Sequence, residues 1–250
     1  MTSRTHGGPE EGPEALGTPQ RVLAIGAHPD DIEFGAGATL ARWAAQRSHI
    51  VMAVVTDGSK GTWDPRQEPA AVAATRKEEQ AAAAKVLGAA EVAHLGYIDG
   101  ELENTMELRS TIARLIREHR PDVVLSHDPW KRYQIHPDHR ATGMGVVDGV
   151  VAARDPLYFP EHGLDAHRPG ALLLWSAEEP DHAEWATDDA MRAKIEALLC
   201  HRSQAKPTMG IGADDEEERR AFGSRVRAEA KRAGEPFGAE SAETFKRLTP

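Results

Sequence analysis

Residues 21–37 have the sequence RVLAIGAHPDDIEFGAG, an apolar run that ends in a polar turn. The apolar run over residues 22–28 is short and almost continuous, which is typical of a strand buried on both faces of a parallel sheet. Polar side chains directly after such a strand lie at its carboxyl end, where open α/β sheets bind ligands. We therefore expect a central strand over 22–28 and a functional turn directly after it.

Short apolar runs recur along the chain and alternate with helical patterns. Apolar residues follow helical spacing near Leu40, over residues 108–116, and after Pro137, which suits the first turn of a helix. This alternation predicts right-handed crossovers and a three-layer α/β fold, Rossmann-like, with a mostly parallel sheet. We predict the remaining strands over residues 50–57, 92–97, 122–128 and 171–177.

Polar residues follow four of the predicted strands. The carboxyl ends of parallel strands meet at one edge of a sheet, so we expect these residues to form one site. They are His28, Asp30 and Asp31 after the first strand, Asp57 after the second, Tyr97 and Asp99 after the third, and His127 and Asp128 after the fourth.

We divide the chain into three parts. Residues 1–20 are rich in Gly, Pro and Glu and lack apolar periodicity, so we expect a disordered tail with order beginning at Arg21. Residues 21–205 form the predicted α/β domain and end in a helix over 189–205. Residues 206–250 are expected to be a helical segment that packs on the same domain, since the final stretch contains two phenylalanines.

Composition argues against several classes of protein. Lys and Arg number 30 against 40 Asp and Glu, a formal net charge of −10, whereas a nucleic-acid binder needs a basic face. The longest apolar run, over residues 50–55, is far too short for a membrane span, and residues 1–20 lack the apolar core of a signal peptide. A lone cysteine, Cys200, excludes an internal disulfide framework. We therefore expect a cytoplasmic protein.

Two histidine motifs suggest a metal site. His28 and Asp31 stand three residues apart in the first motif, HPDD, and the second motif is HPDH over residues 136–139. An imidazole and a carboxylate at this spacing can face one cation, and two His with one carboxylate leave an open position on Zn²⁺, as in catalytic sites. Neighbouring side chains point apart outside helices. One of Asp30 and Asp31 can therefore bind metal while the other takes a proton from water.

Each motif also has a purely structural interpretation. An aspartate ahead of a helix can cap the first amide groups, and a lone histidine at a strand end more often forms hydrogen bonds than binds metal. Two such motifs in one α/β chain favour the metal site.

The two motifs together resemble the phosphatidylinositol-glycan L (PIG-L) / LmbE-like family of zinc-dependent N-deacetylases. The resemblance covers residues 21–205 in the usual order and implies a deacetylase domain of this family over that range. The matching segments are AHPDDIEFGAG (27–37), TDGSKG (56–61), YIDGEL (97–102), HPDHRATG (136–143) and LLCHRSQ (198–204).

The resemblance implies a role for each residue of the two motifs. It makes His28, Asp31 and His139 the zinc ligands. It makes Asp30 the general base that takes a proton from water. It implies that His136 polarises the substrate carbonyl or protonates the leaving amine.

Further candidates lie outside the ligand set. The resemblance places Asp138 behind a ligand, where it would orient an imidazole through its free N–H. Arg76 and Glu79 share the apolar stripe of a predicted helix, so either they form an ion pair or Arg76 reaches the substrate, as the family implies. Asp99 also matches a family position near the substrate. Trp63 is either a platform for a sugar ring or packed on its own domain.

The resemblance implies removal of the N-acetyl group from an N-acetylglucosamine-type conjugate, giving acetate and a free amine. One alternative is an amidase of the same family that cleaves a larger amide, such as a thiol conjugate. A two-metal phosphoesterase would need more ligands, and a non-catalytic sugar- or metal-binding protein would be expected to lack Asp30 or His136. Imidazole and carboxylate suit Fe²⁺ as well as Zn²⁺. The aglycone of the small glycoconjugate and the oligomeric state, a homo-oligomer included, stay open.

Overall fold

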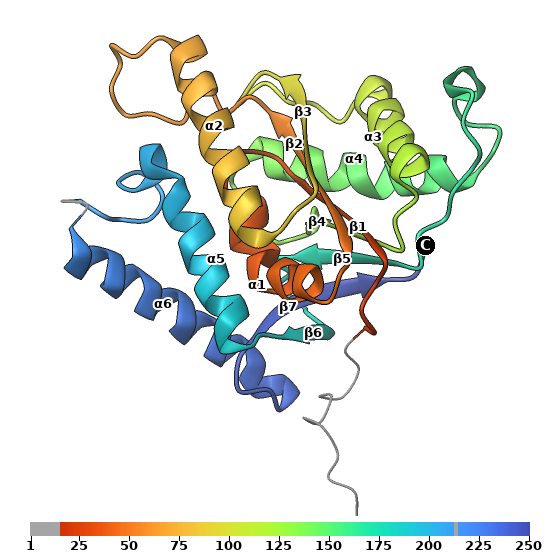
Figure 1. Ribbon diagram of the computed structural model, residues 1–250. Helices are drawn as coiled ribbons and strands as arrows, with labels where there is room; N and C mark the ends of the chain where they lie inside the picture. Colours follow the sequence, from red (N-terminus) through yellow and green to blue (C-terminus); the bar gives the residue numbers. More distant parts are fainter. Residues whose placement is uncertain (1–15, 213–214) are drawn as a thin grey trace, which may run out of the picture.

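The computed structural model describes residues 16–212 and 215–250. Seven strands form one sheet in the order β3-β2-β1-β4-β5-β7-β6, with helices on both faces (Figure 1). The strands are β1 (Arg21–Gly26), β2 (His49–Thr56), β3 (Glu91–Tyr97), β4 (Val123–His127), β5 (Ala171–Trp175), β6 (His182–Trp185) and β7 (Ala242–Leu248). The α-helices are α1 (Asp31–Ala45), α2 (Pro69–Leu87), α3 (Met106–His119), α4 (Pro137–Arg154), α5 (Asp188–Cys200) and α6 (Glu216–Gly234). Within the described ranges, no helix is both long and apolar enough to cross a membrane.

The first five strands confirm the predicted α/β fold. β1 pairs in parallel with β2 on one side and with β4 on the other, and β3 and β5 extend the two sides in parallel. The chain therefore builds the sheet outward in both directions from β1. The carboxyl ends of β1 and β4 consequently border the crevice where such sheets bind ligands.

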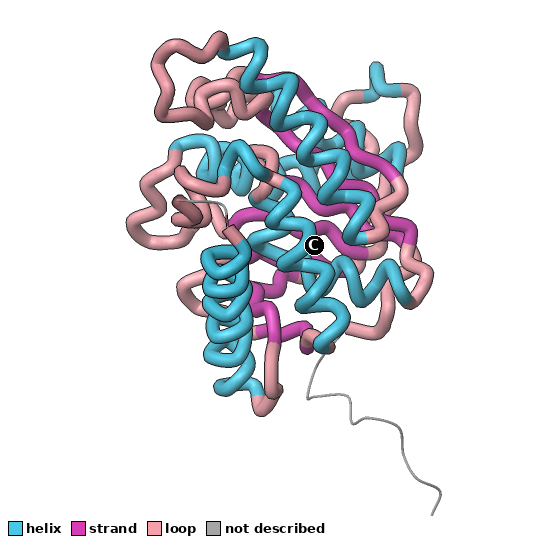
Figure 2. The backbone as a smooth tube through the Cα atoms, turned by 60° about the vertical axis from the view of Figure 1, so that its left-hand side comes forward, coloured by secondary structure: helices cyan, strands magenta, loops and turns pink. Residues whose placement is uncertain are grey.

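The side chains of β1 alternate between two core clusters. Val22 and Ala24 pack with residues of α1, α2 and α5, whereas Leu23 and Ile25 pack with residues of α3 and α4. The strands thus lie between two helical layers (Figure 2). This double coverage explains why the strand sequence is apolar at consecutive positions rather than at alternate ones.

The C-terminal segment contains the predicted helix, as α6, and also a strand that we did not predict. After α6 the chain forms β7, which lies between β5 and β6 and is antiparallel to both. Phe245 of β7 is fully buried in the core cluster on the α1 side, whereas Phe237 is half-buried. The predicted helix over 189–205 ends at Cys200, and a short 3₁₀ helix follows over Arg202–Gln204.

Glu243 shows why β7 has no apolar run in its sequence. This carboxylate is buried and pairs with Lys194 Nζ of α5 at 2.6 Å. It also accepts hydrogen bonds from the N–H groups of Ala38 (3.0 Å) and Thr39 (2.7 Å). Helix α1 is interrupted at Ala36, where φ is −147° and ψ is 16°, so Glu243 caps the second part of this helix.

Ordered structure begins before Arg21. Leu16 packs against the core cluster on the α1 side, and its N–H donates to Glu184 Oε1 at 2.9 Å. The N–H groups of Gln20 and Arg21 both donate to Asp122 Oδ2. Residues 16–20, which we expected to belong to a disordered tail, are therefore ordered. The rest of that expected tail, residues 1–15, lies outside the described residues.

The two C-terminal phenylalanines provide a matched test of this packing. Phe245→Ala should lower the free energy of unfolding by about 3–5 kcal/mol, because it leaves a cavity in the core. Phe237→Ala should cost less than half as much, because that ring is half-buried. Urea unfolding of both variants measures the difference, and equal small losses would show that β7 is not part of the cooperative core.

Candidate metal and active site

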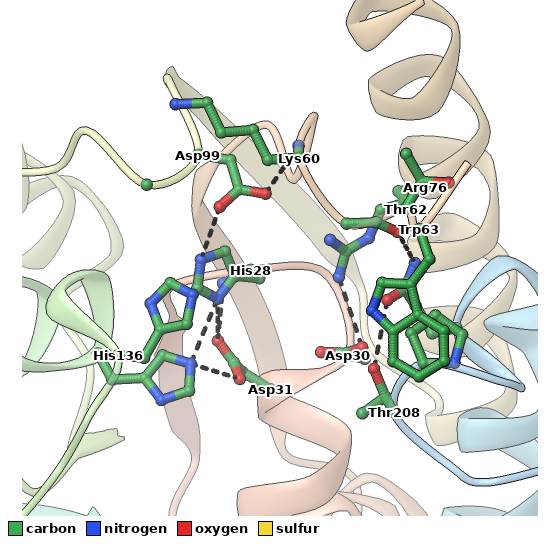
Figure 3. A pocket seen from close by; sticks show the side chains of 15 residues that line it. His28, Asp30, Asp31, Lys60, Thr62, Trp63, Arg76, Asp99, His136 and Thr208 are labelled. Carbon is green, nitrogen blue, oxygen red and sulfur yellow. Dashed lines mark hydrogen bonds and ion pairs between the residues drawn. The ribbon is translucent and has the colours of Figure 1, made fainter. Parts of the chain in front are cut away.

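A cavity of about 510 Å³ opens at the carboxyl ends of the parallel strands (Figure 3). The turn after β1 and the start of α4 form one side of it, and the loop after β2 and the segment after α5 form the other. The lining residues are His28, Asp30, Asp31, Lys60, Gly61, Thr62, Trp63, Arg76, Asp99, Gly100, His136, His139, Gln204, Pro207 and Thr208.

His28, Asp31 and His139 bring three potential ligand atoms together in this cavity. His28 Nδ1 lies 3.3 Å from Asp31 Oδ2, His139 Nε2 lies 3.2 Å from Asp31 Oδ1, and the two imidazole nitrogens are 3.3 Å apart. Ligand bonds of about 2.0–2.1 Å in a tetrahedral zinc site place the ligand atoms about 3.3–3.4 Å from one another. Each pair of these residues therefore has the spacing of two ligands on such an ion, and Asp31 faces the two imidazoles with different oxygens.

Two further carboxylates stabilise positive charge at this point. Asp138 Oδ2 and Asp99 Oδ1 lie 3.0 and 3.3 Å from His28 Nε2. Burial lowers the pKa of His28, but hydrogen bonds to Asp138, Asp31 and Asp99 outweigh it and raise the pKa to about 11. A divalent cation held here would supply the positive charge that these groups favour.

Asp138 and Asp99 also tie neighbouring loops to His28. Asp138 is fully buried at the start of α4, and its Oδ2 accepts the N–H of Gly100 at 2.7 Å. Asp99 Oδ2 accepts the N–H of Lys60 at 3.0 Å. Both aspartates therefore lie behind a candidate ligand, and Asp99 lines the cavity as well.

His136 lies beside the candidate ligands. It precedes Pro137, which occupies the first turn of α4 as expected. Its ring packs edge-on to His28 with centroids 4.5 Å apart and stacks on His139 at 4.8 Å. Its Nδ1 makes no hydrogen bond within the described residues. The ring is therefore placed to contact a molecule in the cavity.

Asp30 points away from the candidate ligands. Its φ of 101° lies in the left-handed region, which a residue with a side chain seldom adopts. This backbone turn separates the Asp30 and Asp31 carboxylates (Figure 3), and Asp30 Oδ2 lies 3.4 Å from Arg76 Nη2. Burial and the charge of Asp31 raise the pKa of Asp30 to about 7, although Arg76 acts in the opposite direction.

Arg76 does not pair with Glu79, so that alternative is wrong. Glu79 instead accepts the N–H and the hydroxyl of Ser203. Arg76 is buried, and its guanidinium donates to the carbonyl oxygens of Gly58 (3.1 Å) and Pro29 (2.6 Å). The loop after β2 closes over this guanidinium, and a Cβ on Gly61 would collide with it.

His127 is a site residue to which the sequence assigned no role. At the end of β4, its Nε2 lies 3.3 Å from Asp31 Oδ2, and its Nδ1 accepts a hydrogen bond from Trp175 Nε1 at 3.1 Å. The backbone N–H of Ala27 also donates to Nε2, at 3.2 Å, so both ring nitrogens face a donor. Burial lowers the pKa of His127 and so favours the neutral form. His127 therefore packs against a candidate ligand at the end of β4.

Three other polar residues at strand ends do not line the cavity, contrary to our expectation. Asp57 Oδ1 accepts one backbone N–H from its own loop and one from the loop after β3. The hydroxyl of Tyr97 lies 3.2 Å from that of Thr111, and Asp128 accepts a backbone N–H from the turn after β4. Asp57 and Asp128 therefore hold turns at the strand ends, whereas Tyr97 contacts α3.

Comparison with known proteins identifies relatives. Residues 23–150 match the PIG-L family, described as GlcNAc-PI de-N-acetylase. The chain is 35% identical over 188 residues to diacetylchitobiose deacetylase of Thermococcus kodakarensis, which covers 74% of this chain and 70% of the relative. It is 31% identical over 171 residues to 1D-myo-inositol 2-acetamido-2-deoxy-alpha-D-glucopyranoside deacetylase of Kineococcus radiotolerans, which covers 56% of this chain and 47% of the relative.

A solved structure shows the same architecture over nearly the whole chain. N,N'-diacetylchitobiose deacetylase from Pyrococcus horikoshii, complexed with its inhibitor MPG, matches with a TM-score of 0.82 and 28% sequence identity. The match covers 92% of this chain and 84% of that one. Together, the family match and the 35% identical deacetylase of Thermococcus kodakarensis show that this chain belongs to the PIG-L family.

Proposed function

We propose that this protein is a metal-dependent hydrolase that removes the N-acetyl group from an N-acetylglucosamine-type conjugate, giving acetate and a free amine. The observation that carries the proposal is the set of ligand atoms from His28, Asp31 and His139, with a separate carboxylate, Asp30, in the same cavity. The relatives named as deacetylases of diacetylchitobiose and of an acetamido-glucopyranoside support it.

We further propose Zn²⁺ as the metal held by His28, Asp31 and His139. Two imidazoles and one carboxylate are the ligand types of a catalytic zinc site, and Fe²⁺ accepts the same types. When bound, Zn²⁺ would lower the pKa of a water molecule and polarise the amide carbonyl. Asp138 and Asp99 hold His28 from its Nε2 side, which fixes the direction of Nδ1.

The protein side chains supply the proton transfers. Asp30 accepts a proton from the water that attacks the acetamide carbonyl. His136 polarises the carbonyl oxygen or protonates the amine nitrogen, which allows the C–N bond to break. Arg76 and Asp99 line the same cavity, where we propose that they lie near the bound sugar.

The wall opposite His28 suits a sugar ring. Trp63 is 70% exposed and lines the cavity there, beside Thr62 and Thr208 (Figure 3). An exposed indole beside hydroxyl groups offers both an apolar face and hydrogen-bond partners to a carbohydrate. We therefore propose that Trp63 contacts the substrate rather than packing on its own domain.

The direct test is release of free amine from a panel of N-acetylglucosaminyl conjugates. The panel includes diacetylchitobiose, an inositol conjugate, a malate conjugate and a larger thiol-conjugate amide. We expect a chelator to abolish release from one or more glucosaminides and added Zn²⁺ to restore it. Cleavage of the thiol conjugate alone would show that the protein is an amidase of larger amides and not a deacetylase. Failure to bind any metal would overturn the site itself.

Two substitutions separate the proposed base from the proposed ligands. Asp30→Asn should retain the metal but lower kcat by about 10²–10⁴-fold, the usual contribution of a general base. His139→Ala should lose the metal, because one of three protein ligands is removed. Metal analysis beside amine release measures both effects. Loss of metal from Asp30→Asn would show that Asp30 is itself a ligand.

Trp63 has a matched control in Trp130. Trp63→Ala should raise KM by about 2- to 10-fold, equivalent to about 0.5–1.5 kcal/mol of aromatic contact, and leave kcat and metal content unchanged. Trp130 is also exposed, at 55%, but does not line this cavity, so Trp130→Ala should leave KM unchanged. Steady-state kinetics of both variants provide the measurement. An unchanged KM in Trp63→Ala would remove this residue from the binding wall.

A further inference from the structure

Three fully buried polar side chains beneath the turn after β1 have no role in the chemistry above. Glu33 of α1, Gln80 of α2 and His201 after α5 are each 0% exposed. Burying such groups costs several kcal/mol unless they are paired, and well-packed apolar side chains are often as stable or more so. Stability alone therefore does not explain this cluster.

The three side chains form a chain of contacts that ends on the backbone of Asp30. Gln80 Oε1 accepts the N–H of Asp30 at 3.1 Å, and Gln80 Nε2 donates to Glu33 Oε1 at 2.6 Å. The same Glu33 oxygen lies 3.6 Å from His201 Nε2. Because Glu33 holds the amide nitrogen of Gln80, the carbonyl oxygen of that amide faces the N–H of Asp30.

Gln80 and Arg76 hold the two ends of one peptide group. The carbonyl oxygen of Pro29 accepts from Arg76 Nη2 at 2.6 Å, and the N–H of Asp30 donates to Gln80 Oε1 at 3.1 Å. These two groups belong to the same peptide plane, and the residues that hold them lie four apart on one face of α2. Fixing this plane fixes the left-handed φ of Asp30, a conformation that costs about 1–3 kcal/mol.

We propose that Gln80, with Glu33 and His201 behind it, is a positioning residue that clamps the Pro29–Asp30 peptide and so aims the Asp30 carboxylate. The inference rests on the proposed role of Asp30 as base. None of the three is among the residues that line the cavity, so they act through Asp30 and not on the substrate. Metal binding stays with His28, Asp31 and His139.

Gln80→Met tests the clamp because it keeps the size of the side chain but removes both hydrogen bonds. We expect kcat to fall by about 10- to 100-fold, the scale of a small misplacement of a catalytic group. KM should stay within twofold and metal content should not change. A crystal structure of the variant should show φ of Asp30 outside the left-handed region.

Glu33 gives a second pair of variants, which keeps the test open if Gln80→Met does not fold. Glu33→Met should lower kcat as Gln80→Met does, whereas Glu33→Gln keeps an acceptor for Gln80 and should restore most of it. Glu184→Met is the control, because Glu184 is an equally buried carboxylate that pairs with Arg42 away from the cavity. It should lower stability and leave kcat unchanged.

The outcomes separate the clamp from the proposed function. Amine release by the native protein together with native kcat in Gln80→Met and Glu33→Met would overturn the clamp and leave the deacetylase. Equal losses of kcat in Glu184→Met and Glu33→Met would show that the loss comes from general destabilisation. That result would also overturn the clamp. If the native protein releases no amine, the deacetylase fails, and φ of Asp30 in the variant structure still decides the clamp.

Discussion

The chain passes from β1 into α1 through a left-handed residue, Asp30, with φ at 101°. This one turn sends the carboxylates of two consecutive residues in different directions. The Asp31 carboxylate contacts His28 and His139, and the Asp30 carboxylate contacts Arg76. The proposed division between a metal ligand, Asp31, and a proton acceptor, Asp30, therefore depends on a strained backbone, which the surrounding elements must stabilise.

The sheet brings the other parts to this turn from distant points in the sequence. β1 and β4 are neighbours, so His127 at the end of β4 and the histidines at the start of α4 face the turn across the crevice. Helix α2 covers the other side. The segment after α5 docks on α2 through Ser203 and Glu79, and Gln204 Nε2 donates to the carbonyl of Gly61 at 2.8 Å. The C-terminal part of the chain thus completes the site.

The sequence predicted those features that repeat or cluster within a short stretch. The buried parallel strands have continuous apolar runs, and the two histidine motifs concentrate candidate ligand residues in short stretches. Strand β7 was not predicted because its buried positions include a charged residue, Glu243. Its ion-pair partner, Lys194, lies in α5, far away in the sequence. His127 and Gln80 are single polar residues whose roles arise only from tertiary contacts. Helical spacing suggested Glu79 as the ion-pair partner of Arg76, but Glu79 accepts a hydrogen bond from Ser203 instead.

A crystal structure of the Zn²⁺-loaded protein, with anomalous data at the zinc absorption edge, tests the proposed ligand set directly. We predict one peak, at about 2.0–2.2 Å from His28 Nδ1, an Asp31 oxygen and His139 Nε2. Three other groups of side chains are close enough to hold an ion: His28 with His136 and His139, Asp31 with His127 and His139, and His28 with Asp99 and Asp138. A peak coordinated by His136 or His127, or one on the Asp99–Asp138 side of His28, would contradict the proposed ligand set.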